Sequence, residues 1–199
     1  MAGPGPDGTL LSRTDGIGLL ARAIGYTLGS LRLVSEVSLT RPTPCRGWSL
    51  EVLLAHMDDS LLALCEAADL GKVSLVPRGQ DDGLLVAPAA VLRARACGLL
   101  RAWARAGRRE VVSVGNRPIG GGALTAAGAV EVTVHGWDVA RSCGHAQPIP
   151  AGLAGEVLDA ARWVLRDEDR PGRFDPPLAL SPGAGPSDQL LAFLGRDPR

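Results

Sequence analysis

Apolar residues recur every three or four positions in four long runs of this chain, and segments rich in proline and glycine separate the runs. This spacing places apolar side chains on one face of a helix. The pattern predicts four helices, at about residues 15–39, 49–70, 88–106 and 123–142. Hydrophobic residues make up 46% of the chain and aromatic residues only 4%, so Leu, Ala and Val must form the core. That core favours helices over strands, and we predict an all-α fold.

The remaining segments predict little further structure. Residues 1–14 mix Pro, Gly, Asp and Thr without periodicity, and we expect a flexible N-terminal arm there. A weaker fifth helix is predicted at about 151–165, and a Pro- and Gly-rich tail regains helical spacing only at about 187–194. With 199 residues, the chain is long enough for one domain, which we place at 15–199.

Charge and cysteine usage exclude several functions. The 21 basic and 21 acidic residues balance, so no excess charge favours nucleic acid or an anionic membrane surface. Arg, Asp or Gly interrupts each apolar run before the roughly 20 residues of a membrane span. The four cysteines lack metal-ribbon spacing and no leader is visible. We expect a cytoplasmic protein with reduced thiols, either a monomer or a homodimer.

The strongest chemical signal is in the fourth run, where Glu131, His135 and Asp138 share one stripe. On a helix, His135 lies about 40° to one side of Glu131 and Asp138 about 20° to the other. Leu124, Ala127 and Val134 lie within about 60° of Glu131, so we expect this stripe to face inward. A buried carboxylate and imidazole pair with each other or bind a divalent metal. A helix-surface ion pair is the simpler alternative.

A third candidate ligand is in the second run. We expect that helix to begin with Ser49 as its N-cap and Glu51 in its first turn. His56 lies at the edge of its apolar stripe, where an imidazole can face a cleft in the bundle. The alternative is a partly buried histidine that is hydrogen-bonded to a backbone carbonyl.

Several motifs together resemble a known family. Residues 42–49 read Pro-Thr-Pro-Cys-Arg-Gly-Trp-Ser and precede His56; residues 131–138 read E-x-x-x-H-G-W-D; residues 195–198 read Gly-Arg-Asp-Pro. This order resembles the mycothiol-dependent maleylpyruvate isomerase-like family of actinobacteria. The resemblance implies a DinB-like four-helix bundle with a divalent metal, usually zinc, bound by two histidines and one glutamate. Its ligands would be His56, Glu131 and His135.

The resemblance also implies a function. Zinc with open coordination positions binds water or the sulfur of a low-molecular-weight thiol. We therefore expect a zinc enzyme that uses mycothiol for S-transfer or thiol-assisted isomerisation of a small electrophilic molecule. A thiol-independent Lewis-acid lyase, hydrolase or cyclase is the alternative enzyme. A non-catalytic metal-binding bundle is the alternative from another class.

Other polar residues have secondary expectations. Asp138 best suits hydrogen bonding to a ligand imidazole, although it can also act as a fourth ligand or pair with Arg141. Arg78 and Arg117 lie in the glycine-bearing segments 71–87 and 115–122, where a guanidinium can bind a carboxylate of the thiol or the substrate. A solvated surface arginine is the alternative for both. We expect a structural role for Cys45, with a nucleophile near the positive end of the second helix as the alternative. For Trp48 and Trp137 we expect packing roles, with substrate platforms as the alternative.

Overall fold

The computed structural model describes residues 16–36, 39–76, 87–107, 109–170 and 174–199. The arm predicted at 1–14 lies outside these residues. The described part is mostly helical, which confirms the all-α prediction. Its helices are α1 (Gly16–Ser30), α2 (Leu50–Leu70), α4 (Pro88–Ala106), α5 (Gly121–Ser142), α6 (Ala151–Val164) and α7 (Pro186–Phe193), with the short 3-10 helices η1 (Leu31–Glu36) and η2 (Asp167–Asp169).

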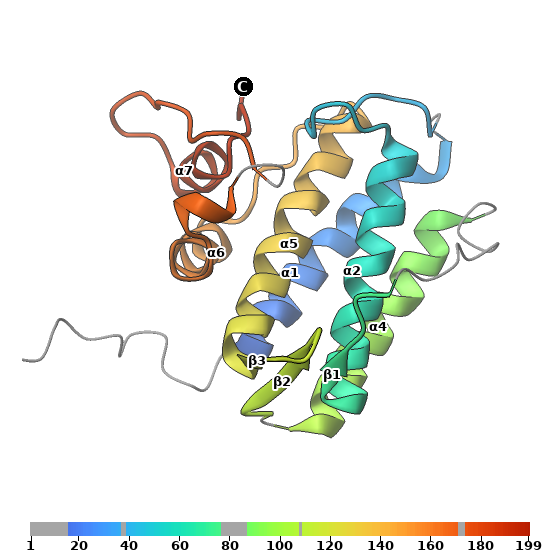
Figure 1. Cartoon of the computed structure of the whole chain (residues 1–199). Coiled ribbons are helices and arrows are strands. Elements are labelled where there is room, and N and C mark those ends of the chain that lie inside the picture. Colours follow the sequence, from blue (N-terminus) through green and yellow to red (C-terminus); the bar gives the residue numbers. More distant parts are fainter. Residues whose placement is uncertain (1–15, 37–38, 77–86, 108, 171–173) are drawn as a thin grey trace, which may run out of the picture.

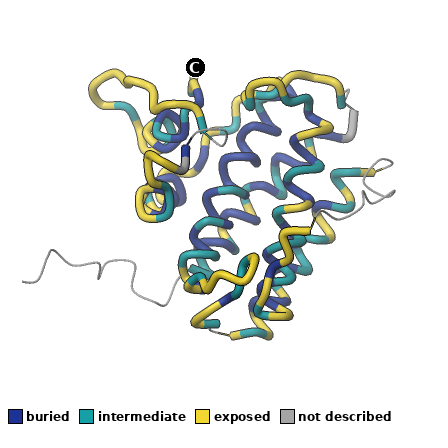
Figure 2. Tube along the Cα trace, in the orientation of Figure 1, coloured by how far each residue is buried: buried dark blue, intermediate teal, exposed yellow. Residues whose placement is uncertain are grey.

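The four long helices pack as the predicted bundle. α1 packs along α5, α2 lies between α4 and α5, and α6 covers another side of α5 (Figure 1). α5 is therefore buried along most of its length, as Figure 2 shows. The DinB-like four-helix bundle with a further C-terminal helix is confirmed.

Local sequence signals explain where the second and third long helices begin and end. The Ser49 Oγ accepts a hydrogen bond of 3.4 Å from the backbone N–H of Val52, so Ser49 is the expected N-cap of α2. Gly71 ends α2 with φ +67°, a left-handed conformation that favours glycine. Pro88 occupies the first turn of α4, where its missing N–H costs no helical hydrogen bond.

A small sheet lies at the end of the bundle where α5 begins (Figure 1). β1 (Lys72–Val73) is parallel to β2 (Val111–Val114), which is antiparallel to β3 (Arg117–Gly120). Gly115 and Asn116 both have positive φ, as the tight turn of a two-residue hairpin requires. The sequence predicted an extended loop here, with at most a fragment of strand, because a two-residue turn and two four-residue strands give little periodic signal.

The N-terminal helix also corrects an expectation. Residues Gly16–Val34 form a stretch of 19 residues with a mean hydropathy of 1.3, which by length and composition could cross a membrane. We had expected no apolar run of that length. Half of this stretch is buried inside the protein. Leu20 and Ile24 have no exposed surface, which is the pattern of a core helix in a bundle.

Candidate metal centre

His56, Glu131 and His135 converge between α2 and α5. His56 lies in the first half of α2, whereas Glu131 and His135 lie one turn apart on α5. Nε2 of His56 contacts Oε1 of Glu131, and Nε2 of His135 lies 3.2 Å from the same oxygen. One donor atom from each residue lies within 4.8 Å of the other two. Two imidazole nitrogens and one carboxylate oxygen at this spacing fit a zinc ion.

The three side chains differ in their access to solvent. The side chain of His135 is 6% exposed, that of Glu131 26% and that of His56 38%. The Glu131 stripe of α5 nevertheless faces the bundle interior as we expected, because Val134, His135 and Asp138 are buried and Glu131 lines a pocket between α1, α2 and α4. Of residues 123–140, those that are not fully buried are Ala123, Leu124, Ala127 and Glu131. His56 is the most exposed of the three side chains, so the centre lies nearest to solvent at His56.

Asp138 lies behind His135, on the side away from Glu131. Its Oδ2 is 2.9 Å from Nδ1 of His135, and its side chain has no exposed surface. We assign the hydrogen to Nδ1, because a carboxylate accepts hydrogen bonds. Nε2 then faces Glu131 and His56, and once it has lost its proton it can bind a metal there.

Two further residues contact the same carboxylate. Nη2 of Arg196, from the segment after α7, lies 3.1 Å from Oδ2 of Asp138. The Cys45 thiol donates to that oxygen at 3.2 Å, and Nη2 of Arg196 lies 3.3 Å from Cys45 Sγ. The sequence predicted a structural role for Cys45, and the structure places its sulfur in this polar cluster.

The charges of the cluster stabilise one another without a metal. Burial raises the pKa of Glu131, but the charges and hydrogen bonds of His135 and His56 outweigh it, so this pKa lies well below its ordinary value. Burial lowers the pKa of His135, but Glu131, Asp138 and Cys45 hold it well above the ordinary value. The pKa of Asp138 is lowered, because His135 and Arg196 outweigh its burial. A metal ion bound to Nε2 of His135 would replace the proton of that imidazolium.

The structure contains a second group of three donor residues, Cys45, His135 and Asp138, whose atoms also lie within 4.8 Å of one another. The guanidinium of Arg196 lies beside both the sulfur and the carboxylate of this group. A cation bound there would be held against a fixed positive charge in a buried place, which is unfavourable. The charges therefore favour a metal at His56, Glu131 and His135.

Trp48 packs against both histidines. Its ring centroid is 4.9 Å from that of His56 and 6.2 Å from that of His135. A hydrogen bond of 3.1 Å from the Thr43 N–H to the Trp48 carbonyl closes the loop that positions it. Trp48 therefore packs as expected, and it does so at the site itself. Trp137 is buried next to the site residues on α5.

The two candidate arginines do not reach this centre. Arg78 lies outside the described residues. Arg117 is exposed in β3, immediately before α5. Glu131 is ten residues after the start of α5, a distance of about 15 Å along the helix. The structure therefore does not bring Arg117 to the metal ligands.

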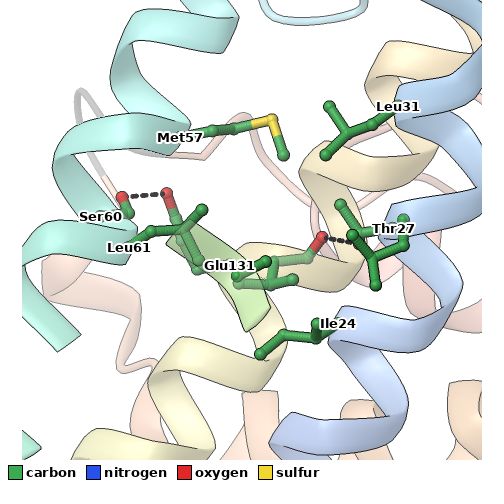
Figure 3. A pocket seen from close by; sticks show the side chains of 10 residues that line it. Ile24, Thr27, Leu31, Met57, Ser60, Leu61 and Glu131 are labelled. Atoms are coloured by element: carbon green, nitrogen blue, oxygen red, sulfur yellow. Dashed lines mark hydrogen bonds between the residues drawn. The ribbon is translucent and has the colours of Figure 1, made fainter. Parts of the chain in front are cut away.

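A small apolar pocket adjoins the carboxylate of Glu131. Figure 3 shows Ile24 and Leu31 of the α1–η1 segment opposite Met57 and Leu61 of α2, with Glu131 between them. The only other polar side chains of the lining are Thr27, which donates to the Val132 carbonyl at 2.7 Å, and Ser60, which donates to Glu131 Oε1 at 3.3 Å. The surroundings of Glu131 are thus apolar toward the bundle interior.

Sequence reasoning missed two residues of this centre. Ser60 lies one turn after His56, and its contact with Glu131 depends on how α2 and α5 pack. Arg196 belongs to the Gly-Arg-Asp-Pro motif that supported the resemblance, but the motif alone gave it no role. The sequence signal for Arg196 was its place in this motif.

Two histidines and one glutamate converge between two long helices of this bundle. The protein is therefore a candidate metal-binding protein. The comparison with known families makes this specific. The model of the Mycothiol maleylpyruvate isomerase N-terminal domain matches residues 20–140, and the chain belongs to this family. The match includes His56, Glu131 and His135, and it ends before α6, α7 and Arg196.

The relatives add no assigned activity. Two uncharacterised proteins from Mycobacterium tuberculosis, one from strain CDC 1551 and one from strain H37Rv, are each 29% identical to this chain over 160 residues. The alignment covers 79% of this chain and 85% of each relative. No solved structure matches the chain significantly.

Proposed function

We propose that this protein is a cytoplasmic zinc enzyme that uses the low-molecular-weight thiol mycothiol. The thiol serves S-transfer to a small electrophilic molecule or thiol-assisted isomerisation of that molecule. The observation behind this proposal is the convergence of His56 Nε2, Glu131 Oε1 and His135 Nε2. The family name supports the thiol and the type of reaction. The proposed zinc ligands are the residues that the family resemblance implied.

The residues of the chain have distinct roles in this proposal. His56, Glu131 and His135 would hold the ion, and three protein ligands would leave it free to bind a further ligand. A zinc ion in such a site stabilises a thiolate at neutral pH or polarises a carbonyl. Asp138 orients His135 through its Nδ1, and Trp48 limits rotation of both imidazoles. The apolar pocket excludes water from the inner side of Glu131.

Metal content tests the ligands. We expect about one zinc per chain in the purified protein, and a large loss of zinc in His56→Ala and in His135→Ala. His145 is the third histidine of the chain and lies exposed outside the site, so His145→Ala is the matched control and retains its zinc. Full zinc content in His135→Ala would refute this ligand set.

A cobalt-substituted protein tests the thiol. We expect mycothiol to change the visible spectrum by forming a sulfur–metal bond, whereas S-methylated mycothiol leaves it unchanged. Turnover of a substrate without thiol, together with no spectral response at saturating mycothiol, would instead support a Lewis-acid enzyme.

A further inference from the structure

We propose that Arg196 is a positioning residue of the metal centre, acting on His135 through Asp138. This inference rests on the proposed zinc site, but it concerns a residue outside the part of the chain that matches the family. It assigns a role in the site to the C-terminal segment, which is remote from the ligands in the sequence.

The geometry joins these residues in series. Oδ2 of Asp138 accepts from Nη2 of Arg196 at 3.1 Å and lies 2.9 Å from Nδ1 of His135. Nε of Arg196 is directed at the other oxygen, Oδ1, at 3.5 Å. The guanidinium therefore contacts both oxygens of a fully buried carboxylate. Because one of these oxygens also bonds His135, the rotation of the carboxylate and that of the imidazole are linked.

Arg196 is itself held firmly. Its backbone N–H donates to the Leu191 carbonyl at 2.8 Å, and its Nη1 donates to the Leu194 carbonyl at 3.0 Å. The guanidinium also lies 5.5 Å from the ring centroid of Phe174. These contacts hold Arg196 in place independently of its contact with Asp138. A flexible surface arginine would have none of these contacts.

The consequence is a preset orientation of a metal ligand. A histidine ligand whose second nitrogen is bound to a carboxylate has a fixed tautomer and a more basic donor nitrogen. Arg196 keeps that carboxylate charged and in place in a buried environment, where an unpaired carboxylate is strongly disfavoured. Nε2 of His135 then faces Glu131 before any metal arrives, so less ordering accompanies binding.

Zinc affinity, measured by competition with a chromophoric chelator, tests the inference on the full chain. We expect Arg196→Met and Asp138→Asn each to weaken zinc binding by about 10–100-fold, the usual effect of losing such a partner. The double variant is expected to bind as Asp138→Asn does, because both changes break the same connection. Arg196→Lys retains the charge and is expected to recover part of the affinity. Arg199 is exposed and pairs with Asp197, so Arg199→Met is the control with wild-type affinity.

The nitrogen-bound proton of His135 gives a second readout that a purely structural residue would not affect. In the zinc-loaded protein we expect a slowly exchanging Nδ1 proton by NMR, and rapid exchange of that proton in Arg196→Met. Wild-type zinc affinity in a folded Arg196→Met protein would overturn the inference. If Arg196→Met does not fold, the double variant decides: affinity equal to that of Asp138→Asn supports the inference, and a further loss overturns it. Failure of the wild-type protein to bind zinc would overturn the metal centre as well.

Discussion

His135 uses both of its ring nitrogens, and this double use distinguishes it from His56. Its Nε2 faces Glu131 and its Nδ1 faces Asp138, whereas His56 presents Nε2 to Glu131 and lies partly in solvent. The spacing of three residues between His135 and Asp138 made their contact predictable from the helix period alone. The contact between Asp138 and Arg196 was not predictable, because 58 residues separate them.

Tyr26 is the single tyrosine of the chain, so its ionisation can be observed without interference. Its hydroxyl donates to the Gln147 carbonyl at 2.8 Å, and burial together with the charge of Asp138 raises its pKa above the ordinary value of 10.0. The unfolded chain therefore loses this proton first as the pH rises. The stability that the neutral phenol contributes is complete below about pH 10 and is lost as the pH rises further, toward the folded-state pKa.

We expect tyrosinate absorbance to appear only as the protein unfolds, in a titration monitored together with circular dichroism. Tyr26→Phe lacks this titration and is expected to lose about 1 kcal/mol of stability at neutral pH with the hydrogen bond. Tyrosinate formation near pH 10 in a protein with native circular dichroism would contradict the assignment.

The close approach of α1 and α5 depends on Gly136, which lies between His135 and Trp137. A Cβ at this position would lie 2.4 Å from Oγ1 of Thr27, whose hydroxyl donates to the Val132 carbonyl. The two helices are therefore in contact through a glycine within the E-x-x-x-H-G-W-D motif. The motif thus contains a packing residue as well as the candidate ligands.

Gly136→Ala is expected to lower the free energy of unfolding by about 1–3 kcal/mol, because the methyl group overfills a packed contact. Urea denaturation in the presence of a chelator measures this without a contribution from metal. Gly25→Ala is the control in the partner helix, since a Cβ there has nothing within 4 Å. This control is expected to gain up to about 1 kcal/mol from the better helix propensity of alanine. Equal stabilities of the two variants would refute the packing role.

The path of the chain after α7 depends on Gly195. Its φ is +76°, and a Cβ would lie 2.5 Å from the backbone oxygen of Asp175. Gly195→Ala is therefore expected to displace Arg196 and to weaken zinc binding toward the loss caused by Arg196→Met. Gly183 has φ +88° but no atom within 4 Å of its Cβ position, so Gly183→Ala is the control for backbone strain alone. Equal zinc affinity of the two variants would contradict the expectation.

At the scale of the whole molecule, the proposed metal connects elements that are distant in sequence. Its ligands come from α2 and α5, and the hydrogen-bonded cluster behind His135 adds the loop before α2 and the segment after α7. An ion that binds only the folded arrangement stabilises it according to its free concentration. The metal and the fold are therefore expected to be thermodynamically linked.

We expect zinc at 100 times its dissociation constant to add about 2.7 kcal/mol of stability, and so to raise Tm by roughly 5–10 °C. Differential scanning calorimetry with zinc and with a chelator measures the shift. The shift is expected to vanish in His56→Ala and to persist in His145→Ala. An equal Tm with and without zinc in the wild-type protein would show that no such linkage exists.

The sequence by itself determined the helices and the candidate ligands. Helical periodicity and the Ser49 cap are local properties, and the ligand spacing on α5 follows from the helix period, so a single sequence shows them. Tertiary structure alone decided how far each ligand is exposed, from 6% for His135 to 38% for His56, because this depends on how α2 and α5 pack. It also decided that Arg196 contacts Asp138 and that Arg117 lies at the far end of α5. Such contacts join residues far apart in the chain, and no periodic pattern records them.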